Sequence, residues 1–390
     1  MSGLFVEMEY AQARKTGQDI CGDAFFSQKI PEENRVVAAL SDGLGSGVKA
    51  NILASMTGTM ALRFVVHRMG DLRSFETIME ALPVCQVRQI SYATFSILDC
   101  TLHGATRLVE MGNPPAVLLR GGRVVEVPDR SMTSPRWNDR AMRLATIETE
   151  PQDRIVLVSD GITQAGLGNP RYPLGWQPEG LNGFLADCVN QQPDISAREL
   201  CRRVLKEAVS KEPRWVPGDD MTVAVAYFRK PRRALVVTGP PFDKERDAEV
   251  ARRLDEFDGR RIVCGGTTAD IVARELNRPI TTDLTCADRQ LPPTSTLEGM
   301  DLVTEGILTL TRTAAYLEQD HTGRGINAAE RLADCLRESD IIEFVVGTRI
   351  NEAHQDPTLP VDLEIRRNII KRIARVLEET YLKEVHIQAI

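Results

Sequence analysis

Two stretches of the chain share one pattern, an apolar run that ends on Ser-Asp-Gly. Residues 36–40 are apolar and lead to Asp42, and residues 155–158 are apolar and lead to Asp160. A short apolar run that stops at turn residues predicts a buried strand, so each strand would present a carboxylate where it ends. Strands that end at the same edge of a sheet can place both carboxylates in one cleft. The pattern therefore points to an acidic site.

Short runs joined by turns dominate the first 230 residues and predict a mainly antiparallel sheet. Besides the two strands above, strands are expected at residues 4–13, 20–27, 92–99, 104–111, 116–120 and 124–128. The strand at 20–27 would form a hairpin with the strand before Asp42, which brings Asp23 next to Asp42. A further apolar strand, residues 221–228, begins directly after Asp219 and Asp220. Acids thus recur where strands meet turns.

Helical spacing of apolar residues predicts helices at residues 48–69, 74–82 and 196–210, whereas residues 131–145 are expected to be loop and partial helix. The first helix would pack on a sheet through its large apolar side chains. These are Ile52, Leu53, Met56, Met60, Leu62, Phe64 and Val65.

From residue 233 onward strands alternate with helices. Strands are expected at 234–238, 261–264, near 302, at 341–346 and at 384–390, and helices at 244–257, 268–276, 305–317, 328–336 and 363–381. This alternation is typical of an α/β domain with a mainly parallel sheet. We therefore expect an α+β chain of two domains, residues 1–230 and 234–390, joined by the basic, proline-containing segment 229–233.

Composition narrows the function classes. The 390 residues contain 48 Lys and Arg against 55 Asp and Glu, a net charge of −7, so a general nucleic-acid footprint is not expected. The eight cysteines are scattered without CxxC spacing, which favours reduced thiols in a cytoplasmic protein over zinc. Neither a signal peptide nor an apolar run of about 20 residues is found, so no membrane association is expected.

The acids at the strand ends suggest a metal site. Oxygen ligands without His or Cys suit Mg²⁺ or Mn²⁺, and two such ions can activate a water for attack on phosphorus. The alternative for each aspartate alone is a turn residue, because Asp-Gly is a common turn pair. For the whole set, with its repeated Ser-Asp-Gly, the metal site is the stronger interpretation.

Five ordered motifs carry a resemblance to a known family. They are Gly22-Asp23, Ser41-Asp42-Gly43-Leu44-Gly45-Ser46-Gly47, Gly112-Asn113-Pro114-Pro115, Ser159-Asp160-Gly161-Ile162 and Asp219-Asp220-Met221-Thr222-Val223. Over residues 1–230 the chain resembles the PPM family of metal-dependent serine/threonine protein phosphatases, in the bacterial branch typified by the sporulation stage II phosphatase. The resemblance implies a β-sandwich flanked by helices, with two ions between the sheets.

The resemblance also implies roles for individual residues. Asp42 would bridge both ions, the Gly43 carbonyl would bind one, Asp160 and Asp219 would hold the other, and Asp23 would lie at the same centre. Asp220 stands where many members carry Asn, which places it behind the ligands, although the two adjacent acids could exchange roles. Catalysis would depend on Asp42 and Asp160 through a metal-activated water.

The chain departs from the family pattern in three places. Asn113 stands where members of this branch often have His, and Arg14 is a weak counterpart of the basic residue that holds substrate phosphate in relatives. The third departure concerns the histidines, none of which falls in a motif, so a histidine general acid is not predicted. They are His67, His103, His321, His354 and His386.

In the second domain, Gly265, Gly266, Thr267 and Thr268 follow a predicted strand and open a helix. Amides and hydroxyls at a helix N-terminus can bind a phosphate or carboxylate, but the segment matches no nucleotide-binding motif. A tight turn with a threonine N-cap is an equal alternative. Loops 238–243, 298–301 and 347–352 could complete a small-molecule pocket.

The sequence is thus interpreted as a metal-dependent protein phosphatase that uses two Mn²⁺ or Mg²⁺ ions and acts on phosphoserine or phosphothreonine of a partner protein. In this branch the partner is often an anti-sigma-factor antagonist type protein. Residues 234–390 would bind a ligand or partner and regulate the activity. Two alternatives stay open: an inactive metal-binding regulatory module, and a small-molecule phosphoesterase that uses the C-terminal domain.

Overall fold

A computed structural model describes residues 4–82, 94–102, 105–283, 291–320, 327–349 and 359–390. The chain forms two compact units, Met1–Lys230 and Pro231–Ile390. Several predicted features lie outside the described residues, namely Cys85, Cys286, His103, His321, His354, residues 92–93 and residues 350–352. Within the described residues, no helix combines the length and the apolar character that spanning a bilayer requires.

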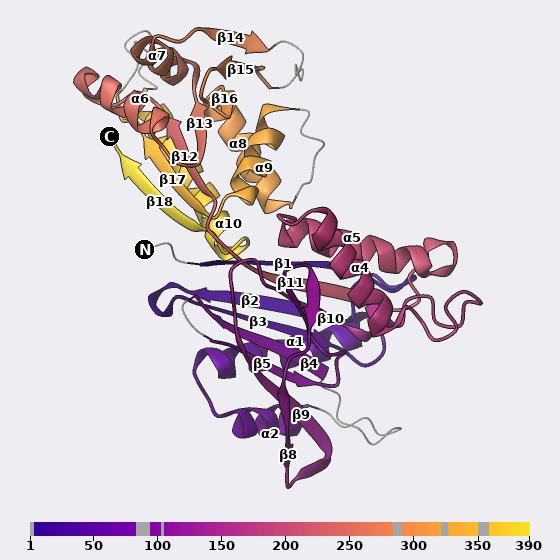
Figure 1. Cartoon of the computed structure of the whole chain (residues 1–390). Helices are drawn as coiled ribbons and strands as arrows, with labels where there is room; N and C mark the ends of the chain where they lie inside the picture. Colours follow the sequence, from indigo (N-terminus) through magenta and orange to yellow (C-terminus); the bar gives the residue numbers. More distant parts are fainter. Residues whose placement is uncertain (1–3, 83–93, 103–104, 284–290, 321–326, 350–358) are drawn as a thin grey trace. The chain divides into compact units, whose positions relative to one another are not determined.

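The first unit contains two antiparallel sheets (Figure 1). One has the order β2-β3-β4-β5-β9-β8, with β2 at Ala24–Ile30, β3 at Arg35–Asp42, β4 at Thr94–Thr101, β5 at Ala105–Met111, β8 at Asp129–Ser134 and β9 at Trp137–Glu148. The other has the order β1-β11-β10-β6-β7, with β1 at Phe5–Ala13, β11 at Met221–Arg229, β10 at Arg154–Val158, β6 at Val117–Arg120 and β7 at Arg123–Val125.

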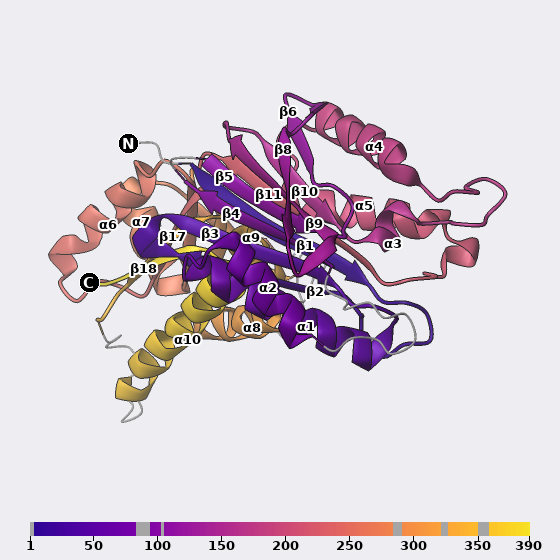
Figure 2. The same cartoon turned by 90° about the horizontal axis from the view of Figure 1, so that it is seen from below.

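Helices cover the outer face of each sheet (Figure 2). Helices α1 (Gly47–Val66) and α2 (Asp71–Ala81) pack on the first sheet, and α4 (Gln177–Gln191) and α5 (Ala197–Lys211) pack on the second. In β10, Val156 and Val158 join the core under α4 and α5, and the alternate residues Ile155 and Leu157 are buried on the opposite face. Both faces of this strand are therefore apolar, and the predicted sandwich flanked by helices is confirmed.

The structure corrects the prediction for residues 131–145. This segment was expected to be loop and partial helix, but it belongs to the antiparallel strands β8 and β9. Strand β9 also pairs with β5, from Ala105 opposite Glu148 to Glu110 opposite Arg143. The local sequence has weak strand character here, and the partner strand β5 lies more than 30 residues earlier in the chain. Sheet pairing therefore overrides local propensity.

The buried face of α1 also differs from the prediction. Its small residues Ala50, Ala54 and Ala61 are buried, whereas Ile52 is 53% exposed and Met56 is 42% exposed. Apolar periodicity identified the helix and correctly assigned Leu62 and Val65 to the core and Leu53, Met60 and Phe64 to its margin, but it wrongly assigned Ile52 and Met56 to the inner face. Small residues let the helix approach the sheet closely, as at Gly58, where an added Cβ would lie 2.9 Å from the ring of Phe26.

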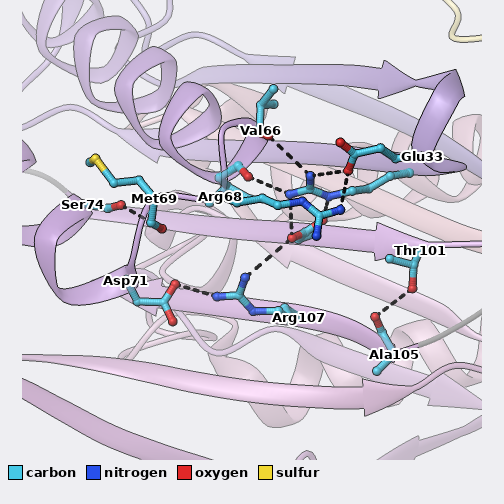
Figure 3. A network of polar contacts seen from close by, with 12 residues as sticks. Glu33, Val66, Arg68, Met69, Asp71, Ser74, Thr101, Ala105 and Arg107 are labelled. Atoms are coloured by element: carbon cyan, nitrogen blue, oxygen red, sulfur yellow. Dashed lines mark hydrogen bonds and ion pairs between the residues drawn. The ribbon is translucent and has the colours of Figure 1, made fainter.

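A polar network links the inner strands β3, β4 and β5 to the end of α1 and the start of α2 (Figure 3). Arg35 is 3% exposed, donates to both carboxylate oxygens of Asp99 at 2.5 and 2.9 Å, and donates to the carbonyl of Val65 at 2.7 Å. Arg107 contacts Asp71, at the start of α2, at 2.6 Å (Figure 3). The orphan carbonyls at the end of α1 are thus satisfied by a buried guanidinium.

The second unit is built on a seven-stranded sheet of order β14-β15-β16-β13-β12-β17-β18. Its strands are β12 at Arg233–Thr238, β13 at Arg260–Cys264, β14 at Ile280–Asp283, β15 at Thr294–Leu297, β16 at Leu302–Thr304, β17 at Ile341–Val346 and β18 at Glu384–Ala389. The five strands from β16 to β18 pair in parallel. The predicted mainly parallel sheet is confirmed, and the antiparallel strands β14 and β15 at its edge were not predicted.

Helices lie on both faces of this sheet. Those of one face are α6 (Asp247–Asp255) and α7 (Gly266–Leu276), and those of the other are α8 (Ile307–Glu318), α9 (Ala328–Glu338) and α10 (Leu359–Glu379). Leu235 and Val237 of β12 face the first pair, and Ala234 and Val236 face the second group. Parallel strands covered on both faces are continuous apolar runs, as this strand is.

Candidate metal centre

Asp42 is the last residue of β3, and its backbone is fixed by the neighbouring strand. Its N–H donates to the hydroxyl of Thr94 at 3.2 Å, and that hydroxyl donates to the Asp42 carbonyl at 2.9 Å. The pairing of Asp42 with Thr94 also ends the β3–β4 ladder. The carboxylate is therefore presented by a rigid strand end, as the sequence pattern predicted.

Asp23 comes directly before β2, whose first residue, Ala24, pairs with Ser41. The predicted hairpin is present, and it brings Asp23 beside Asp42. Asp23 is 2% exposed, and its Oδ2 accepts a hydrogen bond of 2.7 Å from the hydroxyl of Thr222. Its Oδ1 is buried and has no hydrogen-bond partner.

Asp160 follows β10 and begins the single turn α3 (Asp160–Thr163). Its Oδ2 accepts from the side-chain amide of Gln164 at 3.0 Å. The preceding Ser159 accepts at its hydroxyl from the N–H of Thr222 at 2.9 Å, which ties the ends of β10 and β11 together. Asp160 is thus positioned by the strand that begins just after Asp219 and Asp220.

The adjacent acids Asp219 and Asp220 have different surroundings. Asp220 is 5% exposed; its Oδ1 accepts from the backbone N–H of Lys15 at 2.9 Å, and its Oδ2 is buried without a hydrogen-bond partner. Asp219 is more exposed, and its Oδ1 lies 3.8 Å from the Nζ of Lys15. Asp219 and Asp220 both remain candidates for the direct ligand, because each has a carboxylate oxygen available for a cation.

Burial and mutual repulsion raise the pKa values of Asp42, Asp23 and Asp219. Burial, followed by the charges of Asp23 and Asp160, raises the pKa of Asp42 to about 10. Burial also raises the pKa of Asp23 to about 6, with the charge of Asp220 adding to the effect. Burial raises the pKa of Asp219 as well. The fold thus brings together carboxylates that disfavour one another's ionisation, without enough positive charge nearby to compensate their negative charge.

Glycines allow the segments that carry these acids to meet. A Cβ at Gly22 would lie 2.7 Å from Oδ2 of Asp220, and one at Gly161 would lie 2.0 Å from the Asp220 carbonyl oxygen. A Cβ at Gly43 would lie 2.1 Å from the carbonyl oxygen of Ala50 in α1. Backbone therefore packs against backbone around the acids, where a side chain would force the segments apart.

The donor set fits divalent cations of the Mg²⁺ and Mn²⁺ type. The oxygens come only from carboxylates and backbone, and the buried, unpartnered oxygens of Asp23 and Asp220 lack a positive partner. In the side-chain conformations of the structure, no three carboxylates, imidazoles or thiols within the described ranges are close enough together to hold a metal ion. Binding would therefore require small side-chain rotations of the acids, around a backbone that is already in place.

Other candidates from the sequence lie elsewhere. Arg14 is exposed at its hydrogen-bonding end and donates to the carbonyl of Asp19 at 3.0 Å, which fits a role in the turn. Asn113 donates to the hydroxyl of Ser96 at 3.2 Å and keeps a buried Oδ1 without a partner. Of the described histidines, His67 caps the end of α1 and His386 contacts Glu384 in the second unit.

The predicted anion site in the second unit contains an acid. Gly265, with φ of 131°, precedes α7, and Gly266 is the first residue of that helix. A Cβ at Gly266 would lie 3.3 Å from the carboxylate of Glu305, so an anion at this helix start would meet a negative charge. Thr268 is buried, and Thr267 lies beside it in the first turn. Anion binding by these four residues stays a prediction.

The loops at the carboxyl edge of the parallel sheet pack tightly. Gly347 N–H donates to the carbonyl of Thr238 at 2.8 Å, and a Cβ at Gly347 would lie 2.1 Å from the carbonyl oxygen of Pro240. The crevice between β12 and β17, where ligands often bind in such sheets, is therefore filled by backbone.

Sequence reasoning missed the polar residues that orient the acids. Gln12 in β1 pairs with Thr222 in β11, and its amide donates to the hydroxyl of Thr222 at 3.1 Å and to the carbonyl of Asp23 at 3.4 Å. Gln164 supports Asp160 in the same way. The available signal was the polar residue at a strand position otherwise filled by apolar ones.

Comparisons with known proteins give solved structures of low sequence identity. The phosphatase domain of SpoIIE from Bacillus subtilis is 18% identical, with a TM-score of 0.44, over 59% of this chain and 95% of that one. The RsbU and RsbW domains of a Mycobacterium tuberculosis protein are 16% identical, with a TM-score of 0.49, over 73% and 72%. RsbX in complex with magnesium is 18% identical, with a TM-score of 0.40, over 57% and 95%.

No curated protein sequence matches the chain significantly. A family model described as Stage II sporulation protein E (SpoIIE) matches residues 32–229, just over half of the chain. The matched segment includes Asp42, Asp160, Asp219 and Asp220. The resemblance expected from the sequence motifs is confirmed, and the chain belongs to the SpoIIE family.

Proposed function

We propose that the first unit is a metal-dependent serine/threonine protein phosphatase that hydrolyses phosphoserine or phosphothreonine on a partner protein. The observation that supports this most is the convergence of five aspartates from four separated segments, two of which keep a buried oxygen without a partner. Such a site destabilises the protein unless cations bind, so its presence indicates a function. Membership of the SpoIIE family supports the same activity.

In the proposed site, Asp42 is shared by two Mn²⁺ or Mg²⁺ ions, because it lies between Asp23 and Asp160 and feels the charge of both. The Gly43 carbonyl and Asp23 contribute on one side, and Asp160 with Asp219 on the other, with Asp220 behind them. Bound there, the ions would supply a water of lowered pKa as nucleophile and would neutralise charge on the phosphate.

The protein's own residues hold the acids in orientation. Thr222 and Gln164 donate to one oxygen each of Asp23 and Asp160, which leaves the second oxygen of each carboxylate for a cation. Of the histidines within the described residues, neither His67 nor His386 belongs to the centre, and in this proposal solvent or a metal-bound water protonates the leaving serine or threonine oxygen. The partner is a phosphoprotein, of the anti-sigma-factor antagonist type that the family resemblance suggests. For residues 231–390 we propose a regulatory or ligand-binding role.

The test is phosphate release from a phosphoserine peptide and from p-nitrophenyl phosphate by the full chain, with Mn²⁺ and with EDTA. Asp42→Asn and Asp160→Asn should each lower kcat at least about 100-fold, because a ligand of the activating ions is lost. Asp187→Asn, at an exposed position of α4, is the matched control and should leave the rate unchanged.

Metal-dependent activity that survives both site substitutions would show that the centre lies elsewhere. Absence of activity together with tight Mn²⁺ binding would favour an inactive metal-binding module instead. A truncated protein of residues 1–230 should keep the basal activity, whereas an enzyme that needs the second unit to hold a small substrate would lose it.

A further inference from the structure

A cavity of about 530 Å³ in the first unit lies beside the metal centre and is not part of it. Its walls come from the Pro114-Pro115 loop, from the segment that follows β7 and from the start of α4. Pockets of a few hundred Å³ are large enough for a ligand or for several side chains. The two prolines of the Gly-Asn-Pro-Pro motif thus form part of the cavity wall.

The cavity and the metal centre share a wall. Val158 and Thr163 both line the cavity, and Asp160 stands between them in the chain. The hydroxyl of Thr163 donates to the carbonyl of Asp160 at 3.1 Å, so the turn that carries the candidate ligand also borders the cavity. Three residues along a helix rise by about 4.5 Å. A substrate side chain a few positions from a phosphoserine bound at the candidate metal centre can therefore reach the cavity.

The walls of the cavity are aliphatic. Val117 and Leu181 are buried, and Val125 and Val127 extend the apolar surface toward the opening, together with the prolines of the neighbouring loops. Such walls suit a straight hydrocarbon chain. They would not hold a phosphate or another strongly hydrated anion.

Acidic groups and unpartnered acceptors accompany these walls. Glu126 and Asp129 line the cavity with Arg143, and Arg143 donates to Asp129 at 2.5 Å. Asn182 also lines it, and its Oδ1 is buried without a hydrogen-bond partner. An acceptor in that state carries an uncompensated desolvation penalty until a donor reaches it.

A second unpartnered acceptor lies behind the wall. Glu110 is 2% exposed, and its Oε1 accepts from the N–H of Ala116, a lining residue, at 2.8 Å. Its Oε2 has no hydrogen-bond partner, and the nearest guanidinium nitrogen of Arg143 is 3.7 Å away. Arg143 is thus shared between two acids, and the charge around the cavity stays negative.

From this combination we propose that the cavity is a specificity subsite for a Lys or Arg side chain close to the phosphorylated residue of the substrate protein. The aliphatic walls take the methylene stem, and the acidic groups with the Asn182 oxygen take the charged head. This subsite rests on the proposed phosphatase function, and it names the kind of phosphoprotein that the centre accepts.

The test compares phosphoserine nonapeptides with the full chain and Mn²⁺. Arginine is placed at each position from two to four residues on either side of the phosphoserine, and norleucine replaces it in a matched set. We expect at least a tenfold higher kcat/KM for arginine at one of these positions, expressed mainly in KM. Norleucine has the stem without the donors, so it isolates the contribution of the charged head.

Variants assign the effect to the cavity. Asn182→Leu keeps the side-chain size and removes the acceptor, and it should reduce the arginine preference to threefold or less while hydrolysis of p-nitrophenyl phosphate stays unchanged. Asn190→Leu, in the same helix and outside the cavity, is the matched control and should keep the preference. Asp129→Asn should also weaken the preference for arginine, and this variant replaces Asn182→Leu in the test if Asn182→Leu does not fold.

The outcomes separate the two proposals. Equal rates for arginine and norleucine at every position, in an enzyme that hydrolyses both peptides, would overturn the subsite and leave the phosphatase standing. An arginine preference that survives both Asn182→Leu and Asp129→Asn would place recognition elsewhere and overturn the subsite as well. Failure to hydrolyse any phosphopeptide or p-nitrophenyl phosphate with Mn²⁺ would instead remove the proposed function.

Discussion

Buried acids of the candidate metal centre have surroundings opposite to those of the buried acids in the second unit. In the second unit, Asp247 is 3% exposed and contacts Arg274 at 3.0 Å and Arg349 at 3.2 Å, and the fully buried Asp340 has the Nζ of Lys383 at 3.6 Å. In the first unit, Asp23 and Asp220 are equally buried but keep oxygens without partners. A buried acid that pairs with a basic side chain therefore needs no further explanation. A cluster of buried acids that lack basic partners indicates a cation site.

The largest expected effect comes from breaking a pair in the second unit. Lys383→Met removes the ammonium group that lies 3.6 Å from the buried carboxylate of Asp340, and this should lower the free energy of unfolding of that unit by about 3–5 kcal/mol. All three tryptophans, Trp137, Trp176 and Trp215, lie in the first unit, so their fluorescence reports that unit while circular dichroism reports both.

In a urea titration, the dichroism should show an early transition that the fluorescence does not show. The control is Arg246→Met, whose partner Glu249 is exposed, and which should change little. Coincident early transitions by both probes in Lys383→Met would contradict independent stability of the two units.

Removal of a charge should have the opposite effect on stability at the candidate metal centre. Asp42→Asn removes a buried acid that faces other acids, so it should stabilise the metal-free protein by on the order of 2 kcal/mol at pH 8. The folded-state pKa is raised to about 10, so folding takes up a proton at neutral pH. Stability of the metal-free wild type should therefore fall as pH rises from about 4 toward 10, and more steeply than in Asp42→Asn. Thermal unfolding with EDTA across this range measures both effects.

Metal binding should compete with the proton on Asp42. Because the raised pKa of this carboxyl lies above the working pH, binding of Mn²⁺ should release about one proton, and affinity should rise up to tenfold per pH unit between pH 6 and pH 8. Calorimetry in two buffers of different ionisation enthalpy measures the released proton. A pH-independent affinity would show that Asp42 is not a ligand.

The smallest expected effect concerns the segment before Asp219. Arg214 and Trp215 have φ of 59° and 61°, in the left-handed region that glycine adopts without cost. Arg214→Gly should therefore be neutral or stabilising by no more than about 1 kcal/mol, whereas Val216→Gly, at an extended position, should destabilise. Urea unfolding followed by tryptophan fluorescence distinguishes the two variants.

Much of the fold was predictable because its signals are local. The two Ser-Asp-Gly strand ends, the hairpin between Asp23 and Asp42 and the alternation after residue 233 all depend on residues close together in the chain. The strands β8 and β9 were not predicted, because their local sequence has weak strand character and β9 is held between its neighbour β8 and the distant strand β5.

The site was predictable in part for the same reason. The motifs named the five aspartates, but no local pattern links Asp23 to Thr222, which donates to it across 199 positions of sequence. The inner face of α1 was assigned wrongly at Ile52 and Met56, because periodicity favours large apolar residues, whereas close packing on the sheet also selects Ala50 and Ala54. Long-range pairing and close approach are therefore the parts that sequence reasoning did not reach.

The pairing of β1 with β11 has a consequence for synthesis. Phe5 lies opposite Arg229, and Ala13 opposite Met221, so the first strand of the unit finds its partner only in the last. While the chain leaves the ribosome, Tyr10 and its neighbours have to wait for more than 200 further residues before this ladder can close. Contacts so distant in sequence slow folding. During synthesis the first unit would therefore keep β1 unpaired until its final strand had emerged.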